Sequence, residues 1–151
     1  TGSQYIVKTI VTSYLIDKIA DSKNVECFNT LTGFKYIGEV MTRLEGQKTF
    51  IAGGEESYGY LVGEHARDKD AVVSCAMIAE MAAFYKDNGS SLFEALQELY
   101  LEYGFYKEKL VSITKKTLLI CSVFFACKTR IEESISRKCI QHALLELYER
   151  R

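Results

Sequence analysis

Hydrophobic and polar positions recur with different periods along this 151-residue chain, and the changes of period predict where its elements begin and end. Residues 5–12 are rich in β-branched side chains, which predicts a strand that is buried on at least one face. Ser13 can cap a helix that follows at once, because apolar residues then recur at helical spacing. Residues 25–28 predict a short second strand.

The middle of the chain repeats this alternation. Thr32 or Gly33 begins a second predicted helix with one apolar face, and Gly46 ends it. Residues 49–52 predict a third strand and residues 60–62 a fourth. Strands that alternate with helices in this way are typical of an α/β protein, and we expect a three-layer α/β/α domain with a small mixed sheet.

Two longer helices are predicted after the fourth strand. Asp70 is a good N-cap for a helix over residues 71–86, and Ser90 or Ser91 caps another that stops near Gly104. The first of these helices is expected to bury one apolar face, made of Val72, Val73, Ala76, Ile78, Ala79, Ala82 and Ala83.

Residues 53–60 carry the candidate chemistry. This segment reads Gly-Gly-Glu-Glu-Ser-Tyr-Gly-Tyr and directly follows a short apolar run. A strand that ends in a glycine-flanked polar loop is how many α/β proteins present hydrogen-bonding groups to a ligand. The carboxylates of Glu55 and Glu56 and the hydroxyl of Ser57 suit a polyol such as a sugar better than an anion. Loop chemistry alone leaves a solvated turn as the alternative.

Composition narrows the classes of function. A formal net charge of −1 gives no basic field that would favour nucleic acid or an anionic membrane. The five cysteines are odd in number and form no Cys-x-x-Cys pair, which argues against a zinc site or a disulfide framework. No signal peptide is recognised, and the longest apolar run, residues 118–127, is too short to span a bilayer. We therefore expect a cytoplasmic protein with no nucleic-acid or membrane partner and no metal site in this segment.

Four segments of the chain carry a resemblance to a known family. In chain order they are Ile6-Val-Lys-Thr-Ile-Val-Thr12, Thr30-Leu-Thr-Gly-Phe-Lys-Tyr-Ile-Gly38, Gly54-Glu-Glu-Ser-Tyr-Gly59 and Arg67-Asp-Lys-Asp70. In this order they resemble the third domain of the α-D-phosphohexomutases, in the phosphoglucomutase/phosphomannomutase branch. The resemblance runs from about Tyr5 to Lys116, so residues 1–116 are expected to form this domain. Its start looks clipped, because a helix precedes the first strand in the family.

The resemblance implies a function for a longer protein. Members of the family move a phosphoryl group between the 1- and 6-positions of a hexose through a bisphosphorylated intermediate, in a cleft ringed by four domains. The first domain supplies a phosphoserine, the second a carboxylate-bound Mg²⁺, the third a sugar-reading loop and the fourth a phosphate-binding loop. The implied ligands and partners are therefore a hexose phosphate, Mg²⁺ and hexose 1,6-bisphosphate in the full-length enzyme, and the remaining mutase domains.

The resemblance also assigns roles to individual residues. Glu55 and Ser57 are expected to bind the 3- and 4-hydroxyls of the sugar. Lys35 is expected at the cleft, near phosphate or sugar oxygens. Arg67 and Lys69 are weaker assignments, and they could act only by positioning the loop.

The other residues in and near the acidic loop have structural roles as their expected or alternative interpretation. Glu56 is either a weaker sugar ligand or a structural carboxylate that pairs with Lys69 or a helix end. Tyr58 and Tyr60 are expected to pack at the base of the loop, and His65 to be a partly buried polar residue. No residue of this segment is predicted to be catalytic.

The chain does not contain the other motifs that the family's reaction needs. It has no Ser-His-Asn-Pro phosphoserine loop, no Asp-x-Asp-x-Asp metal loop and no Ser-Gly-Thr phosphate loop. Phosphoryl transfer depends on such parts for positioning and charge stabilisation. The isolated chain is therefore expected to be inactive, although its family is one of intramolecular phosphotransferases. The alternative is a stand-alone sugar-phosphate-binding or protein-interaction module.

Residues 117–151 lie beyond the resemblance and are expected to form a helical C-terminal extension. Residues 131–151 read as an amphipathic helix, whose apolar stripe is Ile131, Ile135, Cys139, Ile140, Ala143, Leu144, Leu147 and Tyr148. A truncated or frameshifted gene product, an extension that covers a bare face of the domain, and a dimerisation helix are the three open explanations. Self-association through this helix is therefore a prediction to test.

Overall fold

The computed structural model describes residues 3–108, and within them four strands form one open sheet. The strands are β1 (Gln4–Thr9), β2 (Glu26–Thr30), β3 (Thr49–Gly54) and β4 (Tyr60–Val62). Their order across the sheet is β2-β1-β3-β4. β1 runs parallel to β2 and β3, whereas β4 runs antiparallel to β3. The sheet is small and mixed, as the sequence predicts.

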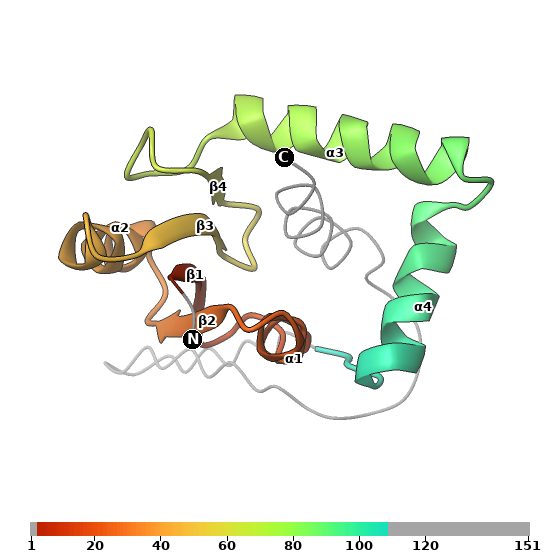
Figure 1. Cartoon of the computed structure of the whole chain (residues 1–151), viewed down its shortest axis with the longest axis horizontal. Coiled ribbons are helices and arrows are strands. Elements are labelled where there is room, and N and C mark those ends of the chain that lie inside the picture. Colours follow the sequence, from red (N-terminus) through yellow and green to blue (C-terminus); the bar gives the residue numbers. More distant parts are fainter. Residues whose placement is uncertain (1–2, 109–151) are drawn as a thin grey trace, which may run out of the picture.

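Helices cover both faces of this sheet. They are α1 (Leu15–Ser22), α2 (Phe34–Leu44), α3 (Ala71–Asp87) and α4 (Leu92–Tyr103). Residues of α2 pack with one face of the strands, and residues of α1, α3 and α4 pack with the other. In Figure 1, α2 lies beside the strands while α3 runs across the top of the view and α4 descends from its end. The prediction of an α/β/α domain is therefore confirmed.

The alternation of side chains along β1 builds these two cores. Tyr5 and Val7 point into the α2 side, where Tyr5 makes ring contacts with Phe28 and Phe50. Ile6 points into the opposite core. A strand covered on both faces buries nearly every side chain, which explains the continuous apolar run Tyr5-Ile6-Val7 in place of polar alternation.

The predicted starts of α3 and α4 are confirmed by side-chain caps, whereas the predicted Ser13 cap is wrong, because α1 has Tyr14 as its N-cap and no side-chain cap bond. The carboxylate of Asp70 accepts hydrogen bonds from the backbone N–H groups of Val72 and Val73 at 2.9 and 3.1 Å. Ser91 and Glu94 form a reciprocal capping box at the start of α4. These bonds satisfy N–H groups that have no partner inside the helix, so the signals could be recognised from local sequence.

Several strand ends and one helix face differ from the sequence prediction. β2 and β3 each run two residues past their predicted ends. β1 ends at Thr9 instead of residue 12, because the N–H of Thr12 turns back to donate to the carbonyl of Thr9 at 3.0 Å. The predicted apolar face of α3 is wrong in part: Val72 is 81% exposed, whereas Met81, which the prediction omitted, is 2% exposed. Ala76, Ala79 and Ala83 are exposed as well. The helix is apolar nearly all round, so its periodicity could not select the buried side.

The predictions for the C-terminal part concern residues that lie outside the described range. The expected boundary at residue 116 and the amphipathic helix over 131–151 are both among them. Between residues 3 and 108, none of the helices is long and apolar enough to cross a bilayer.

Candidate functional site

The acidic loop, residues 55–59, lies where β3 ends and β4 begins. The N–H of Glu55 donates to the carbonyl of Gly59 at 2.8 Å, which closes the loop at its base. Because β1, β2 and β3 are parallel, their carboxyl ends lie at the same edge of the sheet. The loop therefore shares this edge with the turns that follow β1 and β2.

Glu55 connects two of the four motifs. Its side chain is only 8% exposed, and its Oε1 accepts a hydrogen bond from the backbone N–H of Gly33 at 2.7 Å. Gly33 is the N-cap of α2, so the carboxylate lies at the N-terminal end of that helix. Oε2 accepts no hydrogen bond from any residue in the described part of the chain. The carboxylate is thus fixed through one oxygen while the other can accept a bond from a ligand.

Lys69 lies against the acidic loop. A Cβ atom built on Gly59 would be 2.5 Å from Cδ of Lys69 and 3.3 Å from Oε2 of Glu55. The ammonium of Lys69 lies 5.1 Å from the ring centroid of Phe34 and forms an ion pair with Asp68 at 2.8 Å. Half of the Lys69 side chain is exposed. The glycine therefore lets the stem of the lysine and the carboxylate approach each other.

Glu56 does not pair with Lys69 or a helix end, so that part of its structural interpretation is wrong. Its Oε2 accepts a hydrogen bond from the hydroxyl of Thr9 at 2.9 Å. Glu56 is half-buried, whereas the neighbouring Ser57 is exposed. The two adjacent glutamates are therefore held by different segments, Glu55 by the start of α2 and Glu56 by the end of β1.

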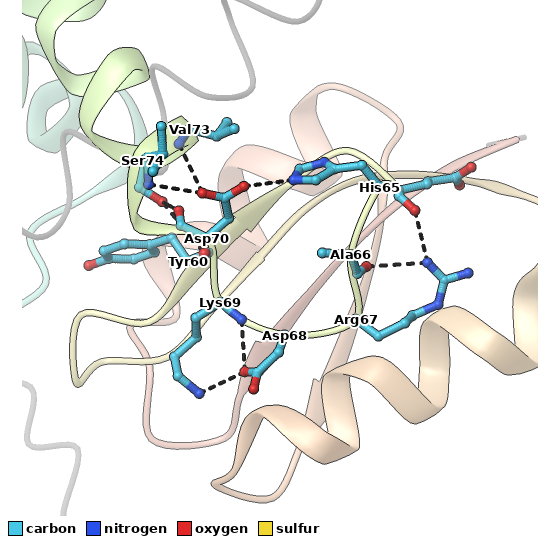
Figure 2. A network of polar contacts seen from close by, with 11 residues as sticks. Tyr60, His65, Ala66, Arg67, Asp68, Lys69, Asp70, Val73 and Ser74 are labelled. Carbon is cyan, nitrogen blue, oxygen red and sulfur yellow. Dashed lines mark hydrogen bonds and ion pairs between the residues drawn. The ribbon is translucent and has the colours of Figure 1, made fainter.

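Arg67 and Lys35 have surroundings that differ from those of Lys69. The guanidinium of Arg67 donates to the carbonyls of Glu64 and Ala66 and forms an ion pair with Glu45 at 3.1 Å. In Figure 2 its side chain lies on a different side of the segment from that of Lys69. Lys35 is exposed, and its ammonium lies 4.8 Å from the ring centroid of Tyr36. Of these cations, Lys69 is the one that the structure brings to the acidic loop.

Asp70 and His65 form part of the local framework that is drawn in Figure 2. The Nε2 atom of His65 lies 2.7 Å from Oδ2 of Asp70. This contact, together with the N–H groups of Val73 and Val72, holds the pKa of Asp70 below its usual value. Half of the His65 side chain is exposed, which agrees with the prediction of a partly buried polar residue. The histidine supports the cap of α3.

The two tyrosines of the loop have different environments. Tyr60 is 6% exposed and belongs to the core, which confirms its predicted packing role. Tyr58 is 66% exposed, so the same prediction for this residue is wrong. Its φ angle of 66° places it in the left-handed region, which bulky residues rarely adopt. Such a conformation carries strain that the surrounding loop must hold.

Sequence reasoning missed three polar residues near the end of β1. Lys8 is 1% exposed and forms an ion pair with Asp17 at 3.0 Å. Thr9 is fully buried and Thr12 is 8% exposed. The available signal was a lysine and two threonines inside a stretch that otherwise reads as a buried strand. Buried polar groups need partners, so they could have been marked as a network.

Residues that could hold a metal ion do not gather in the described part of the chain. Between residues 3 and 108, no group of three or more His, Cys, Asp and Glu side chains is close enough to do so. The Mg²⁺ that the resemblance implies for the full-length enzyme therefore does not fit these residues.

Comparison with protein families gives one match that covers most of the chain. A family model described as phosphoglucomutase/phosphomannomutase, alpha/beta/alpha domain III, matches residues 1–103. The matched region contains all four motifs of the sequence analysis.

Individual relatives agree with this match. A phosphoglucomutase of Staphylococcus saprophyticus is 34% identical over 113 residues, which cover 74% of this chain and 20% of the relative. A phosphoglucomutase of Staphylococcus aureus is 36% identical over 113 residues, with 75% and 20% covered. A crystal structure from Thermus thermophilus, whose protein is named a phosphomannomutase, superposes with a TM-score of 0.54 at 26% identity. It covers 75% of this chain and 26% of that structure. The chain spans about a fifth of the length of the curated relatives it matches.

Proposed function

The chain belongs to the phosphoglucomutase/phosphomannomutase family through its alpha/beta/alpha domain III, and from this premise we propose that it is the sugar-binding domain of a hexose-phosphate mutase. The enzyme would interconvert hexose 1-phosphate and hexose 6-phosphate through a bisphosphorylated intermediate in the cytoplasm. The observation that carries the proposal is the buried carboxylate of Glu55, bound to the N–H of Gly33 beside the exposed Ser57 and Lys69.

The geometry of Glu55 suits a hydroxyl donor. Its Oε1 is occupied by Gly33, so the carboxylate cannot rotate freely, and Oε2 keeps a fixed direction. A carboxylate that is fixed before the ligand arrives loses little conformational freedom on binding. The Ser57 hydroxyl adds a donor and an acceptor next to it. This pair can read neighbouring hydroxyl groups in the middle of a sugar ring without contacting a phosphate.

Such recognition fits a substrate that must bind in two orientations. Either phosphate-bearing end of the hexose has to reach the same phosphoryl donor during the reaction. Hydroxyls in the middle of the ring can be presented to the loop in a similar way in both orientations. Lys69 adds a cation beside the loop, and a compact ammonium can follow a phosphate that changes its position.

The proposal also holds that this chain alone does not catalyse the reaction. It contains none of the phosphoserine, metal-binding or second phosphate-binding motifs, and the residues between 3 and 108 gather no metal ligands. In a full-length enzyme, other domains would supply Mg²⁺ and bind the hexose 1,6-bisphosphate intermediate. Turnover of glucose 1-phosphate by the purified chain at ordinary enzyme rates would contradict this part.

The experiment that tests the site is a titration of the isotope-labelled 151-residue chain with glucose 1-phosphate, followed by NMR. We expect weak binding with the largest amide shift changes at Glu55, Ser57 and Gly33. A Glu55→Ala, Ser57→Ala double variant should lose these changes. A matched Ser90→Ala, Glu98→Ala double variant, which changes the same residue types around α4, should keep them. Undiminished binding by the first variant would reject the assigned site.

A further inference from the structure

The hydroxyls of Thr9 and Thr12 form a directed chain that ends on the acidic loop. Their oxygen atoms are 2.7 Å apart, and the hydroxyl of Thr9 donates to Oε2 of Glu56 at 2.9 Å. A hydroxyl has one proton, so when Thr9 donates to Glu56 the proton between the threonines must come from Thr12. Both threonines are buried, where an unsatisfied hydroxyl is costly. Both hydroxyl protons are therefore donated, and the hydrogen bonds run in one direction, from Thr12 through Thr9 to Glu56.

The Thr12 end of these hydrogen bonds is held by a lysine that also forms an ion pair. The ammonium of Lys8 lies 3.0 Å from Oδ2 of Asp17 on α1 and 3.5 Å from the carbonyl oxygen of Thr12. The N–H of Thr12 donates to the carbonyl of Thr9, which closes a turn over residues 9–12. This turn is thus held to both β1 and α1, and it gives Glu56 a rigid partner.

The two glutamates of the loop are held at two separate points. Gly33 fixes Glu55 from the β2–α2 connection, and Thr9 fixes Glu56 from the β1–α1 connection. We propose that Thr9 and Thr12 are positioning residues that act through Glu56 to orient the acidic loop, so that Glu56 serves the loop and does not bind sugar. This inference rests on the proposed function, because the oriented loop is the proposed sugar-binding loop.

A spectroscopic signal separates positioning from a general contribution to stability. The amide proton of Gly33 is bound to a charged carboxylate, which should move its NMR resonance downfield in the ligand-free chain. If Thr9 orients the loop, removing its hydroxyl should displace Glu55 and return this resonance toward ordinary values. A loss of stability that leaves the loop in place would not change it.

The experiment compares three variants of the labelled full chain. Thr9→Val removes the hydroxyl and keeps the shape, Thr9→Ser keeps the hydroxyl, and Thr42→Val removes a hydroxyl that bonds Gly38 inside α2. We expect Thr9→Val to lose the downfield Gly33 resonance and to weaken glucose 1-phosphate binding about tenfold in Kd. Thr9→Ser should restore both. A Gly33 resonance and a Kd in Thr9→Val that match those of Thr42→Val would overturn the proposal.

A further variant, Glu56→Ala, tests the same link in case Thr9→Val does not fold. Glu56 is half-buried, so Glu56→Ala should leave the fold intact while it removes the same link from the loop side. The same change of the Gly33 resonance is expected in the ligand-free protein, and an unchanged resonance would overturn the positioning role. If the unmodified chain does not bind glucose 1-phosphate, the proposed function fails, but the ligand-free comparison still decides whether these threonines orient the loop.

Discussion

Two polar segments flank β4, and they satisfy their charges in different ways. In the acidic loop, Glu55 and Glu56 bind partners that are 22 and 47 positions away in the chain. In the segment that connects β4 to α3, residues 63–70, most partners are within five positions, as in the pairs His65–Asp70 and Lys69–Asp68. Charged side chains that bind partners close to them in sequence stabilise only their own segment. Charges held from distant segments fix one loop relative to the rest of the domain, which is what a ligand requires.

The largest effect is expected where β3, which carries the acidic loop, touches β1. A Cβ atom on Gly53 would lie 2.9 Å from the backbone carbonyl oxygen of Val7, and neither strand can move away because both lie inside the sheet. We expect Gly53→Ala to lower the free energy of unfolding by about 2 kcal/mol. Urea denaturation followed by circular dichroism measures this change.

Gly46→Ala is the matched control for this substitution. Gly46 has a φ angle of 71°, and a Cβ there would meet nothing within 4 Å. Its cost should come from the left-handed backbone alone, about 1 kcal/mol. Equal losses for the two variants would mean that the close approach of the strands is not what constrains Gly53.

The next effect concerns the locally satisfied segment. Asp70→Ala removes the cap of α3 and its contact with His65, and we expect the melting temperature to fall by about 5 °C. Asp87→Ala, at the last residue of the same helix, should cause no loss because a carboxylate is unfavourable there. Differential scanning calorimetry compares the two variants.

The pH dependence of this difference follows from the lowered pKa of Asp70. Its hydrogen bond with His65, followed by those from the N–H groups of Val73 and Val72, lowers the pKa from 3.8 in the folded chain. A carboxyl with a depressed pKa stabilises the fold above its unfolded pKa, and this contribution is lost as pH falls through the folded value. The gap in melting temperature between the unmodified chain and Asp70→Ala should therefore narrow below about pH 4. A gap that stays constant down to about pH 2 would show that the charge is not involved.

The smallest effects separate the two cations of residues 63–70. Arg67 is bound to Glu45 and to two carbonyls, so Arg67→Ala should change the Kd for glucose 1-phosphate by less than about twofold. Lys69 lies against the acidic loop, and Lys69→Ala should weaken binding by about fivefold. Isothermal titration or NMR titration gives both constants. A larger loss of affinity in Arg67→Ala than in Lys69→Ala would indicate that the phosphate binds near Arg67.

The sequence was most informative where structure depends on near neighbours. The caps at Asp70 and Ser91 and the four strands could be predicted because their signals lie within a few residues. The bonds from Gly33 to Glu55 and from Thr9 to Glu56 could not be predicted, because they depend on how distant loops meet. Position along the chain also could not show that Tyr58 projects outward while Tyr60 is buried. The resemblance identified the loop, but only the structure shows what holds it.

The central place of β1 has a consequence for synthesis of the chain. β1 pairs with β2 on one side and with β3 on the other, and Tyr5 meets Phe50 about 45 residues later. During translation at roughly 5–20 residues per second, the edge of β1 that faces β3 must wait about 2–9 s for its partner. An open strand edge of this kind invites pairing with other chains. The nascent domain should therefore need protection of that edge until β3 has been made.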